Sequence, residues 1–428
     1  MLPLLDAGLQ EKVASSAEHI PVQLGGDRLS LERCAIVGLR HAGANDLAVA
    51  RLERLLPTLS DRDCLDVLLE IGEIAMEYGE KKTVERTVDD IARNGMCSEN
   101  DEISNARLLS LEADLAERVD DRVALDARAA VHLRHAMQGE TGITTALTLL
   151  ECLRLLGTDY QRTSLWERGR AVLREATQIA KTYGLDSLPA ACAVRAELEY
   201  NDGLQFGKAG DALDALRRGL DEALLHGWFT VATEIAAMIL HLSVIRSRYA
   251  DAVAWYDWLS TNGSGRLPEW QQHVIASEGA HALTMTKQPK RAIAILNSAD
   301  DRRACYAATL KVRRSEALAA LGDPQSAAKE AMGALADSEN ARFRTGIARS
   351  KRVLASCYKA LGQYGKARAH LADSIALCET SETPYELLRT MAIASMVLSD
   401  EKLRAEAIEL AQLLLEEGGS HPCTPPDH

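Results

Sequence analysis

Hydrophobic residues along this chain recur at the spacing of one helix face, and short turns separate the helical stretches. The clearest stretch is residues 355–375, ASCYKALGQYGKARAHLADSI. Its pattern predicts the end of one helix, a tight turn, and a second helix from Tyr364, with Gly362 supplying the left-handed conformation that ends a helix. On the second helix, the small Ala367 permits close approach of the first helix, and Leu371 continues the apolar face. This segment is therefore predicted to be a helical hairpin.

The hairpin recurs along almost the whole chain. The positions equivalent to Ala367 are Ala48, Val84, Ala124, Ala171, Ala212, Ala252, Ala292, Ala327 and Ala407. Successive positions lie 35 to 47 residues apart, and most of the steps are 40 or 41 residues. A generic helical bundle with coincidental spacing is the alternative, and this regularity disfavours it. Because one hairpin buries too little apolar surface to be stable alone, the units must stack on a shared core.

The repeat pattern also predicts the organisation of the chain. It gives a lead-in at 1–24, repeats 1–3 at 25–136, an insertion or break at 137–145, repeats 4–10 at 146–418, and a disordered tail at 419–428. The break is placed where MQGETGITT lengthens the spacing to 47 residues, and the tail begins where the apolar pattern is lost.

The best-defined unit has small residues, Leu-Ala and Tyr in its first helix, Gly at the turn, and Tyr and Ala in its second. These features are carried by Leu354, Ala355, Tyr358, Gly362, Tyr364 and Ala367. The pattern resembles that of the tetratricopeptide-repeat (TPR) superfamily, over roughly residues 25–418. A period near 40, where the common TPR has about 34 residues, resembles the long-repeat MalT-like subtype of bacterial regulators and signalling ATPases. The resemblance implies an all-α solenoid of about ten tandem helix-turn-helix repeats in a right-handed superhelix, with the first helices on the concave wall.

Composition and charge narrow the function. Aromatic residues make up 4% of the chain, and no apolar run is long enough to cross a membrane. The net charge of −13 disfavours nucleic acid as a partner. The amino terminus lacks the basic and apolar regions of a secretory signal, and nine scattered cysteines indicate a reducing compartment. We therefore expect a cytoplasmic protein with no membrane segment.

Motifs that carry chemistry are missing from the sequence. It contains no GxxxxGK[ST], HExxH or GxSxG motif. His132 and His135 lie three residues apart on a predicted helix, but no third ligand accompanies them, so a solvated pair is favoured over a metal site. The sequence predicts no catalytic residue, no metal and no cofactor, and hence no enzyme.

Residues 59–91 resemble a LuxR-type DNA-binding helix-turn-helix in rhythm. The helix that would read DNA carries Lys81, Lys82 and Arg86, but also acidic residues such as Glu85 that would face the phosphates. Because the same residues fit the repeat register, we expect a repeat unit here and no DNA reading.

Local charge indicates a binding surface. Residues 302–370 hold 14 Lys/Arg and five Asp/Glu, whereas the chain as a whole is acidic. Part of this charge falls on the predicted concave wall, at Arg349, Arg352, Ser356 and Lys359, with Arg389 at the equivalent place in the next unit. Such a set can grip an acidic peptide, a terminal carboxylate or a phosphorylated ligand. The alternative is a solvated face that pairs with acidic neighbours.

The middle units place mixed polar and apolar residues at the equivalent wall positions. These are Glu197, Asn201, His241, Val244, Ser277, His281 and Thr284. From them we select His241 and His281, together with the basic set, as candidate partner-binding residues. The mixture suits a peptide groove or a small-ligand pocket, and it also suits plain exposure to solvent.

Two functions follow as hypotheses. The first is a non-enzymatic, cytoplasmic signalling or regulatory adaptor that binds a protein or an acidic peptide in its concave groove. The second is implied by the MalT-like resemblance: an effector-sensing domain of a transcriptional or signalling regulator, in which a small ligand changes superhelix pitch and assembly state. The sequence leaves self-association open.

Overall fold

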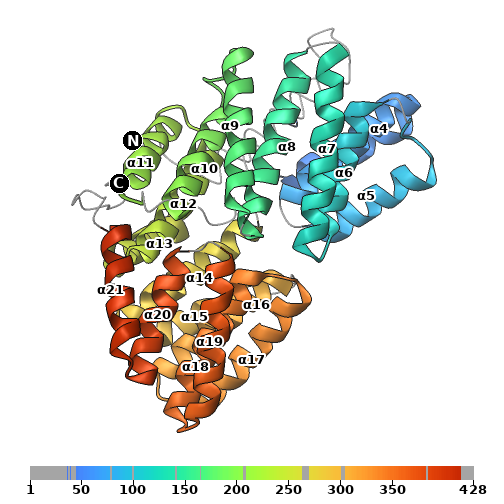
Figure 1. Ribbon diagram of the computed structural model, residues 1–428. Helices are drawn as coiled ribbons and strands as arrows, with labels where there is room; N and C mark the ends of the chain where they lie inside the picture. The colour runs from blue at the N-terminus through green and yellow to red at the C-terminus, as the bar shows by residue number, and fades with distance from the viewer. Residues whose placement is uncertain are drawn as a thin grey trace.

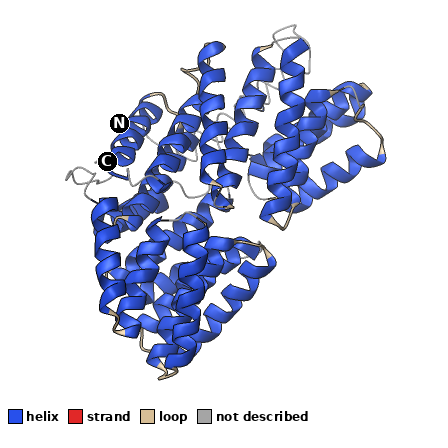
Figure 2. Cartoon of the chain, viewed as in Figure 1, coloured by secondary structure: helices blue, strands red, loops and turns tan. Residues whose placement is uncertain are grey.

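The computed structural model describes residues 36, 39, 45–77, 80–98, 101–139, 142–163, 165–205, 209–262, 269–299, 304–381 and 384–415. Throughout this part of the chain the regular structure is helical (Figure 2). The predicted lead-in at 1–24 and tail at 419–428 lie outside the described residues, and the proposed boundaries stay a prediction. No helix among the described residues combines the length and the apolar character needed to span a bilayer.

The helices pack as consecutive antiparallel pairs, as the repeat pattern predicts. The first helices of the pairs are α4 (Asp61–Glu77), α6 (Glu102–Leu115), α8 (Ile143–Arg162), α10 (Pro189–Gln205), α12 (Phe229–Ile245), α14 (Glu269–Met285), α16 (Ala304–Ala320), α18 (Arg344–Ala360) and α20 (Pro384–Leu398). The second helices are α5 (Lys81–Arg93), α7 (Val119–Gly139), α9 (Trp166–Thr182), α11 (Ala209–Leu225), α13 (Tyr249–Asn262), α15 (Pro289–Ser298), α17 (Pro324–Asn340), α19 (Tyr364–Thr380) and α21 (Glu401–Leu415). Before them lie α3 (Asn45–Leu55) and a 3-10 turn, η2 (Leu56–Thr58). The all-α solenoid is confirmed.

The turns confirm the predicted caps. Gly322 and Gly362 adopt φ of 86° and 74°, the left-handed region that glycine enters at little cost. Ser247 and Lys287 occupy the equivalent turns of two other units and adopt φ of 58° and 63° without being glycine. The stacked core therefore imposes the turn conformation even where the local residue disfavours it.

Two of the predicted repeat positions are wrong. Ala367, Ala327 and Ala292 are fully buried where the hairpins meet, but Ala124 and Ala171 are exposed. In the α8–α9 pair the close approach is made at Gly169, where an added Cβ would lie 3.1 Å from the Gly157 carbonyl oxygen. The spacing of small residues located these two units but named the wrong contact residue in each.

The segment that resembles a DNA-reading module belongs to the array. Residues 61–77 and 81–93 form α4 and α5, which pack on each other as an ordinary repeat pair. Arg86, on the helix that would have entered the groove, instead forms an ion pair with Glu53 of α3.

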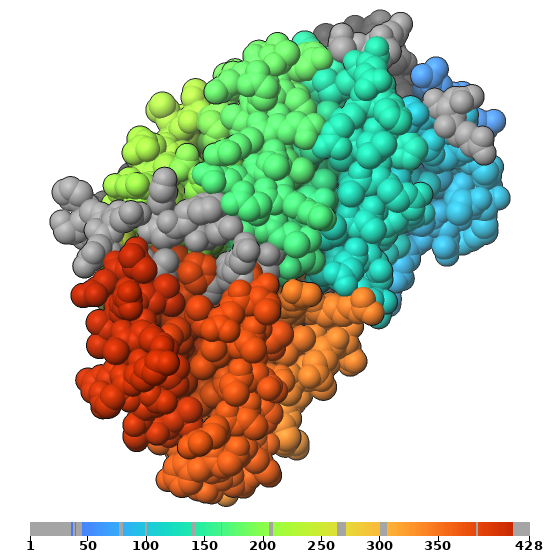
Figure 3. All heavy atoms as spheres, viewed as in Figure 1, coloured from blue at the N-terminus to red at the C-terminus, as the bar shows by residue number. Residues whose placement is uncertain are grey.

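The array curls back on itself (Figure 1). The side chain of Tyr385 at the start of α20 is buried in the same core cluster as α10, α12 and α14. Arg162 at the end of α8 lies 3.3 Å from the hydroxyl of Tyr306 on α16, and Arg342 lies 3.4 Å from Asp120 on α7. In the space-filling view the segment around α7 and α8 borders the segment around α16 and α17 (Figure 3). The first helices therefore enclose an interior space.

Candidate functional site

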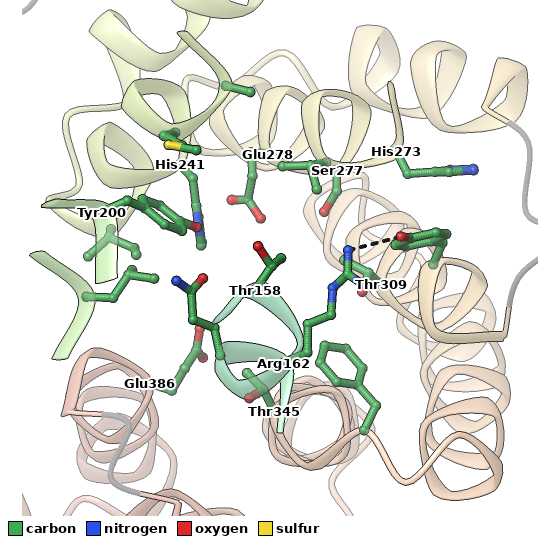
Figure 4. A pocket seen from close by; sticks show the side chains of 18 of the residues that line it. Thr158, Arg162, Tyr200, His241, His273, Ser277, Glu278, Thr309, Thr345 and Glu386 are labelled. Atoms are coloured by element: carbon green, nitrogen blue, oxygen red, sulfur yellow. Dashed lines mark hydrogen bonds between the residues drawn. The ribbon is translucent and has the colours of Figure 1, made fainter. Parts of the chain in front are cut away.

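A cavity of about 240 Å³ lies inside the curl. Seven consecutive first helices contribute side chains to its wall, from α8 through α20 (Figure 4). This volume exceeds the roughly 150 Å³ of an apolar cavity that takes up benzene. Apolar and aromatic side chains alternate with buried polar groups, as is common where a protein holds a ligand and fixes its orientation.

One wall of the cavity is built by Tyr200 of α10, His241 of α12 and Glu278 of α14. The Tyr200 hydroxyl contacts Nδ1 of His241, while the buried Nε2 of His241 has no hydrogen-bond partner among the described residues. Burial lowers the pKa of His241 to about 4, although Glu278 opposes this. The imidazole is therefore neutral at neutral pH.

Glu278 belongs to a buried ionic group behind this wall. Its two carboxylate oxygens lie 3.0 and 3.1 Å from the guanidinium of Arg313, a side chain with only 1% exposure. Burial raises the pKa of Glu278, but Arg313 acts together with His241, Arg349 and His281, and their sum lowers the pKa to about 2. Arg313 also pairs with Glu316, which accepts from His281 at 2.7 Å.

The predicted basic residues Arg349, Arg352 and Arg389 surround a single carboxylate. Arg349 and Arg352 each lie 2.7 Å from an oxygen of Glu386 on α20, and Arg389 lies 4.0 Å away. Arg352 and Glu386 are 3% and 6% exposed. Burial raises the pKa of Glu386, but the three guanidinium groups outweigh burial and hold that pKa well below its ordinary value. These cations are therefore already paired within the molecule.

The structure does not bring all the predicted site residues together. His241 and Arg349 line the cavity, as do Glu197 and Ser277 from the same predicted wall. Arg352, Arg389 and His281 lie behind it in the ionic groups. Ser356 donates to the Arg352 carbonyl, and Lys359 donates to the Met396 carbonyl at 2.6 Å. As partner-binding residues, all of them stay a prediction.

The helix α8 also contributes side chains to the cavity wall. Arg162 pairs with Asp159 at 2.8 Å and donates a hydrogen bond to the hydroxyl of Tyr306 on α16. The Tyr306 ring in turn stacks on His273 at 5.0 Å between centroids. Nothing in the sequence marks Arg162 as a wall residue, because its position depends on the curl of the array and not on the repeat register.

Glu197 of α10 differs from the other carboxylates of the wall. It is 3% exposed and forms no ion pair within the described part of the chain. Burial raises the pKa of Glu197, and Arg154 and Arg162 only partly oppose this. Both of these arginines pair at 2.8 Å with other carboxylates, Arg154 with Glu151 and Arg162 with Asp159.

The two histidines that were considered as a metal pair have a shared carboxylate partner. His132 contacts Glu102, and His135 lies 4.0 Å from the same side chain. Across the described ranges, no three His, Cys, Asp or Glu side chains are grouped so as to hold a metal ion.

The chain matches no family model and no curated protein. It does match solved structures. A chain of the APC/C hetero-tetramer Cut9–Hcn1 aligns with a TM-score of 0.56 at 13% identity, over 98% of this chain and 81% of that one. A Rap protein complexed with Competence and Sporulation Factor gives a TM-score of 0.40 at 15% identity, over 83% and 89% of the two chains. The P58(IPK) TPR domain gives 0.26 at 14% identity, over 81% and 98%.

At these identities the likeness concerns the fold alone. The alignment with Cut9–Hcn1 covers nearly the whole chain and agrees with a TPR-like solenoid. The MalT-like subtype stays a prediction.

Proposed function

We propose that this protein is a non-enzymatic TPR-like binding protein, and that it holds a short peptide segment in the cavity enclosed by its first helices. The observation that carries the proposal is the convergence of seven consecutive first helices on one cavity. A ligand held there contacts most of the array at once, so its binding energy is shared among repeats. We further propose a regulatory or adaptor role in the cytoplasm.

The lining supports binding rather than bond-making chemistry. Aromatic and aliphatic side chains such as Trp166, Phe343 and Met238 offer surface for van der Waals contact. Most charged groups of the wall are held by fixed partners, as Glu278 is by Arg313 and Glu386 by Arg349. Groups fixed in this way can orient a ligand without reorganising when it binds.

Effector sensing is the second candidate. The curl is closed by a few contacts between distant helices, including Arg162 with Tyr306 and Arg389 with the Val244 carbonyl. A ligand that prefers one curvature shifts the population toward it. A small effector in the cavity would therefore act on the pitch of the whole array.

A substitution that fills the cavity tests the proposal. Val274 of α14 lines the cavity, whereas Val131 of α7 lies outside it with 46% exposure. We expect Val274→Trp to abolish retention of synthetic pentapeptides in affinity selection read by mass spectrometry, because the indole occupies the ligand's space. Val131→Trp is the matched control and should retain them. Equal retention of peptides by the two variants would show that the cavity is not the peptide-binding site. Retention of metabolites but not of peptides would favour the effector function.

A further inference from the structure

We infer that the ligand of the central cavity is a peptide with a cationic group, a lysine or arginine side chain or a free amino terminus, which Glu197 receives. This inference rests on the proposed function and specifies the chemistry of its ligand. It reverses the charge expected from the basic wall, which suggested an acidic peptide.

The carboxylates of the cavity wall differ in whether they have a cationic partner. Four carboxylates line it, but three have a fixed cation. Glu234 lies 3.6 Å from Arg154, Glu278 lies 3.0 Å from Arg313, and Glu386 lies 2.7 Å from Arg349. Glu197 is the remaining carboxylate of the described wall, and its charge has no such partner.

A buried carboxylate that forms no ion pair destabilises a protein in its charged form. Burial raises the pKa of Glu197 and outweighs Arg154 and Arg162, which favour the charged form from a distance, as well as the neutral groups of Gln161 and Thr158. A cation delivered by a ligand would supply the missing charge at the point where the wall lacks one. The unfavourable free energy of the unpaired, buried Glu197 would then be relieved when the ligand binds.

Aromatic rings line the same cavity as this carboxylate. Tyr200 follows it by three residues on α10, so the two side chains share a helix face. Trp166 and Tyr306 line the same cavity. Ammonium and guanidinium groups are attracted to aromatic faces as well as to carboxylates. A cavity that combines this carboxylate with aromatic rings is therefore suited to an organic cation.

An unpartnered hydrogen-bond donor on the cavity wall favours a peptide ligand over a simple amine. The buried Nε1 of Trp166 has no acceptor among the described residues, and it lies on the wall of the cavity. An indole nitrogen can only donate, so it needs an acceptor from the ligand. Peptide carbonyls supply acceptors, whereas a polyamine carries cations and no carbonyl.

Among the described residues of the cavity wall, both arginines already have a carboxylate partner, which disfavours an acidic ligand. Arg349 and Arg352 are held by Glu386, and Arg162 is held by Asp159. An anionic ligand would have to displace one of these buried pairs and leave a carboxylate uncompensated.

The test uses the full chain and defined probes. Three pools of acetylated, amidated pentapeptides differ only at the central residue, which is lysine, norleucine or glutamate, and spermidine serves as an acceptor-free polyamine. We expect the wild type to select the lysine pool. Glu197→Gln should weaken the best lysine peptide at least about tenfold in calorimetric titration, because it removes a buried charge partner. Glu199→Gln, the same change on the exposed side of α10, should leave the affinity unchanged.

Each outcome separates the inference from the function on which it rests. Equal selection of the norleucine or glutamate pool, or full affinity in Glu197→Gln, would overturn the cationic ligand. The proposed function would still stand if Val274→Trp blocks that binding. Spermidine that binds as tightly as the peptides would overturn the peptide assignment, and retention of no pool would overturn both.

A structural role for Glu197 predicts a different signature. Without ligand, Glu197→Gln should melt at the same temperature as the wild type or higher, since an uncompensated charge is removed. A lower melting temperature would show that Glu197 stabilises the fold, and it would contradict the inference.

Discussion

Arg352 was predicted to bind a partner, but in the structure it forms a buried ion pair. It falls on the predicted wall, but its guanidinium is buried and shares Glu386 with Arg349. The guanidinium of Arg352 also donates a hydrogen bond to the hydroxyl of Thr390 at 3.3 Å. A positively charged stretch therefore marks an ionic group that joins α18 to α20.

Replacing the shared carboxylate tests this interpretation. We expect Glu386→Gln to lower the free energy of unfolding by about 3 kcal/mol at neutral pH, because it leaves buried guanidinium groups without a counter-charge. Chemical denaturation measures the change. Glu401→Gln is the control, because it removes a 3.7 Å pair with Arg404 on the exposed face of α21, and it should change stability by less than about 1 kcal/mol. Similar effects of the two substitutions would contradict the interpretation.

Glu386 also makes the stability of the protein depend on pH. Its folded-state pKa is depressed, so the unfolded chain binds more protons as the pH falls. The stabilisation from Glu386 is complete above the ordinary pKa of 4.5 and is lost as the pH falls below it. The difference in stability between wild type and Glu386→Gln should therefore narrow below pH 4.5.

At the scale of elements, several turns between paired helices share a residue in the left-handed conformation. Gly362 and Lys287 occupy equivalent turns in left-handed conformations, although only glycine adopts these without steric cost. The stacking of the hairpins therefore determines the conformation of the turn. The residue at the turn changes only how much this conformation costs in free energy.

Opposite substitutions at these two turns should have opposite effects. We expect Gly362→Ala to destabilise the protein by about 1 kcal/mol, because an added Cβ strains the left-handed backbone. Lys287→Gly should stabilise it by about 0.5 kcal/mol, since the greater freedom of glycine in the unfolded chain offsets part of the relief. Unfolding free energies from denaturant titration measure both, and a stabilising Gly362→Ala would contradict the assignment.

At the scale of the whole molecule, contacts between distant repeats hold the curl that forms the cavity. Arg389 of α20 donates to the Val244 carbonyl near the end of α12 at 2.7 Å, and Tyr385 is buried among the side chains of α10, α12 and α14. In a strictly linear solenoid, each repeat touches only its neighbours. Here the array gains a second set of contacts.

Removing one of these contacts should loosen the curl without unfolding the helices. We expect Arg389→Leu to speed amide hydrogen exchange at the end of α12 and along α20, while far-ultraviolet circular dichroism stays unchanged. The lost hydrogen bond to a charged donor corresponds to about 1.5–3 kcal/mol of local protection. Arg404→Leu, on the exposed face of α21, is the control. Exchange that is unchanged in Arg389→Leu would show that the curl does not depend on this contact.

The sequence by itself determined the helical hairpin and its repetition. Periodicity, small residues such as Ala367 and the glycine at position 362 are local properties, and they predict a helix, a turn and a packed face from neighbouring residues alone. The same register predicted that His241, Ser277 and Glu197 share a wall. It misplaced the close approach at Ala171 because one glycine, Gly169, replaced the expected alanine at a shifted phase.

Only the tertiary structure decided which residues meet across the array. Small rotations between successive repeats accumulate over the solenoid, and no residue pattern records their sum. That sum places Arg162 against Tyr306. The packing of the neighbouring helices α18 and α20 brings Glu386 to Arg349 and Arg352, which neutralises the predicted basic wall. Glu197 forms no ion pair among the described residues, because Arg154 and Arg162 of the neighbouring first helix pair with Glu151 and Asp159.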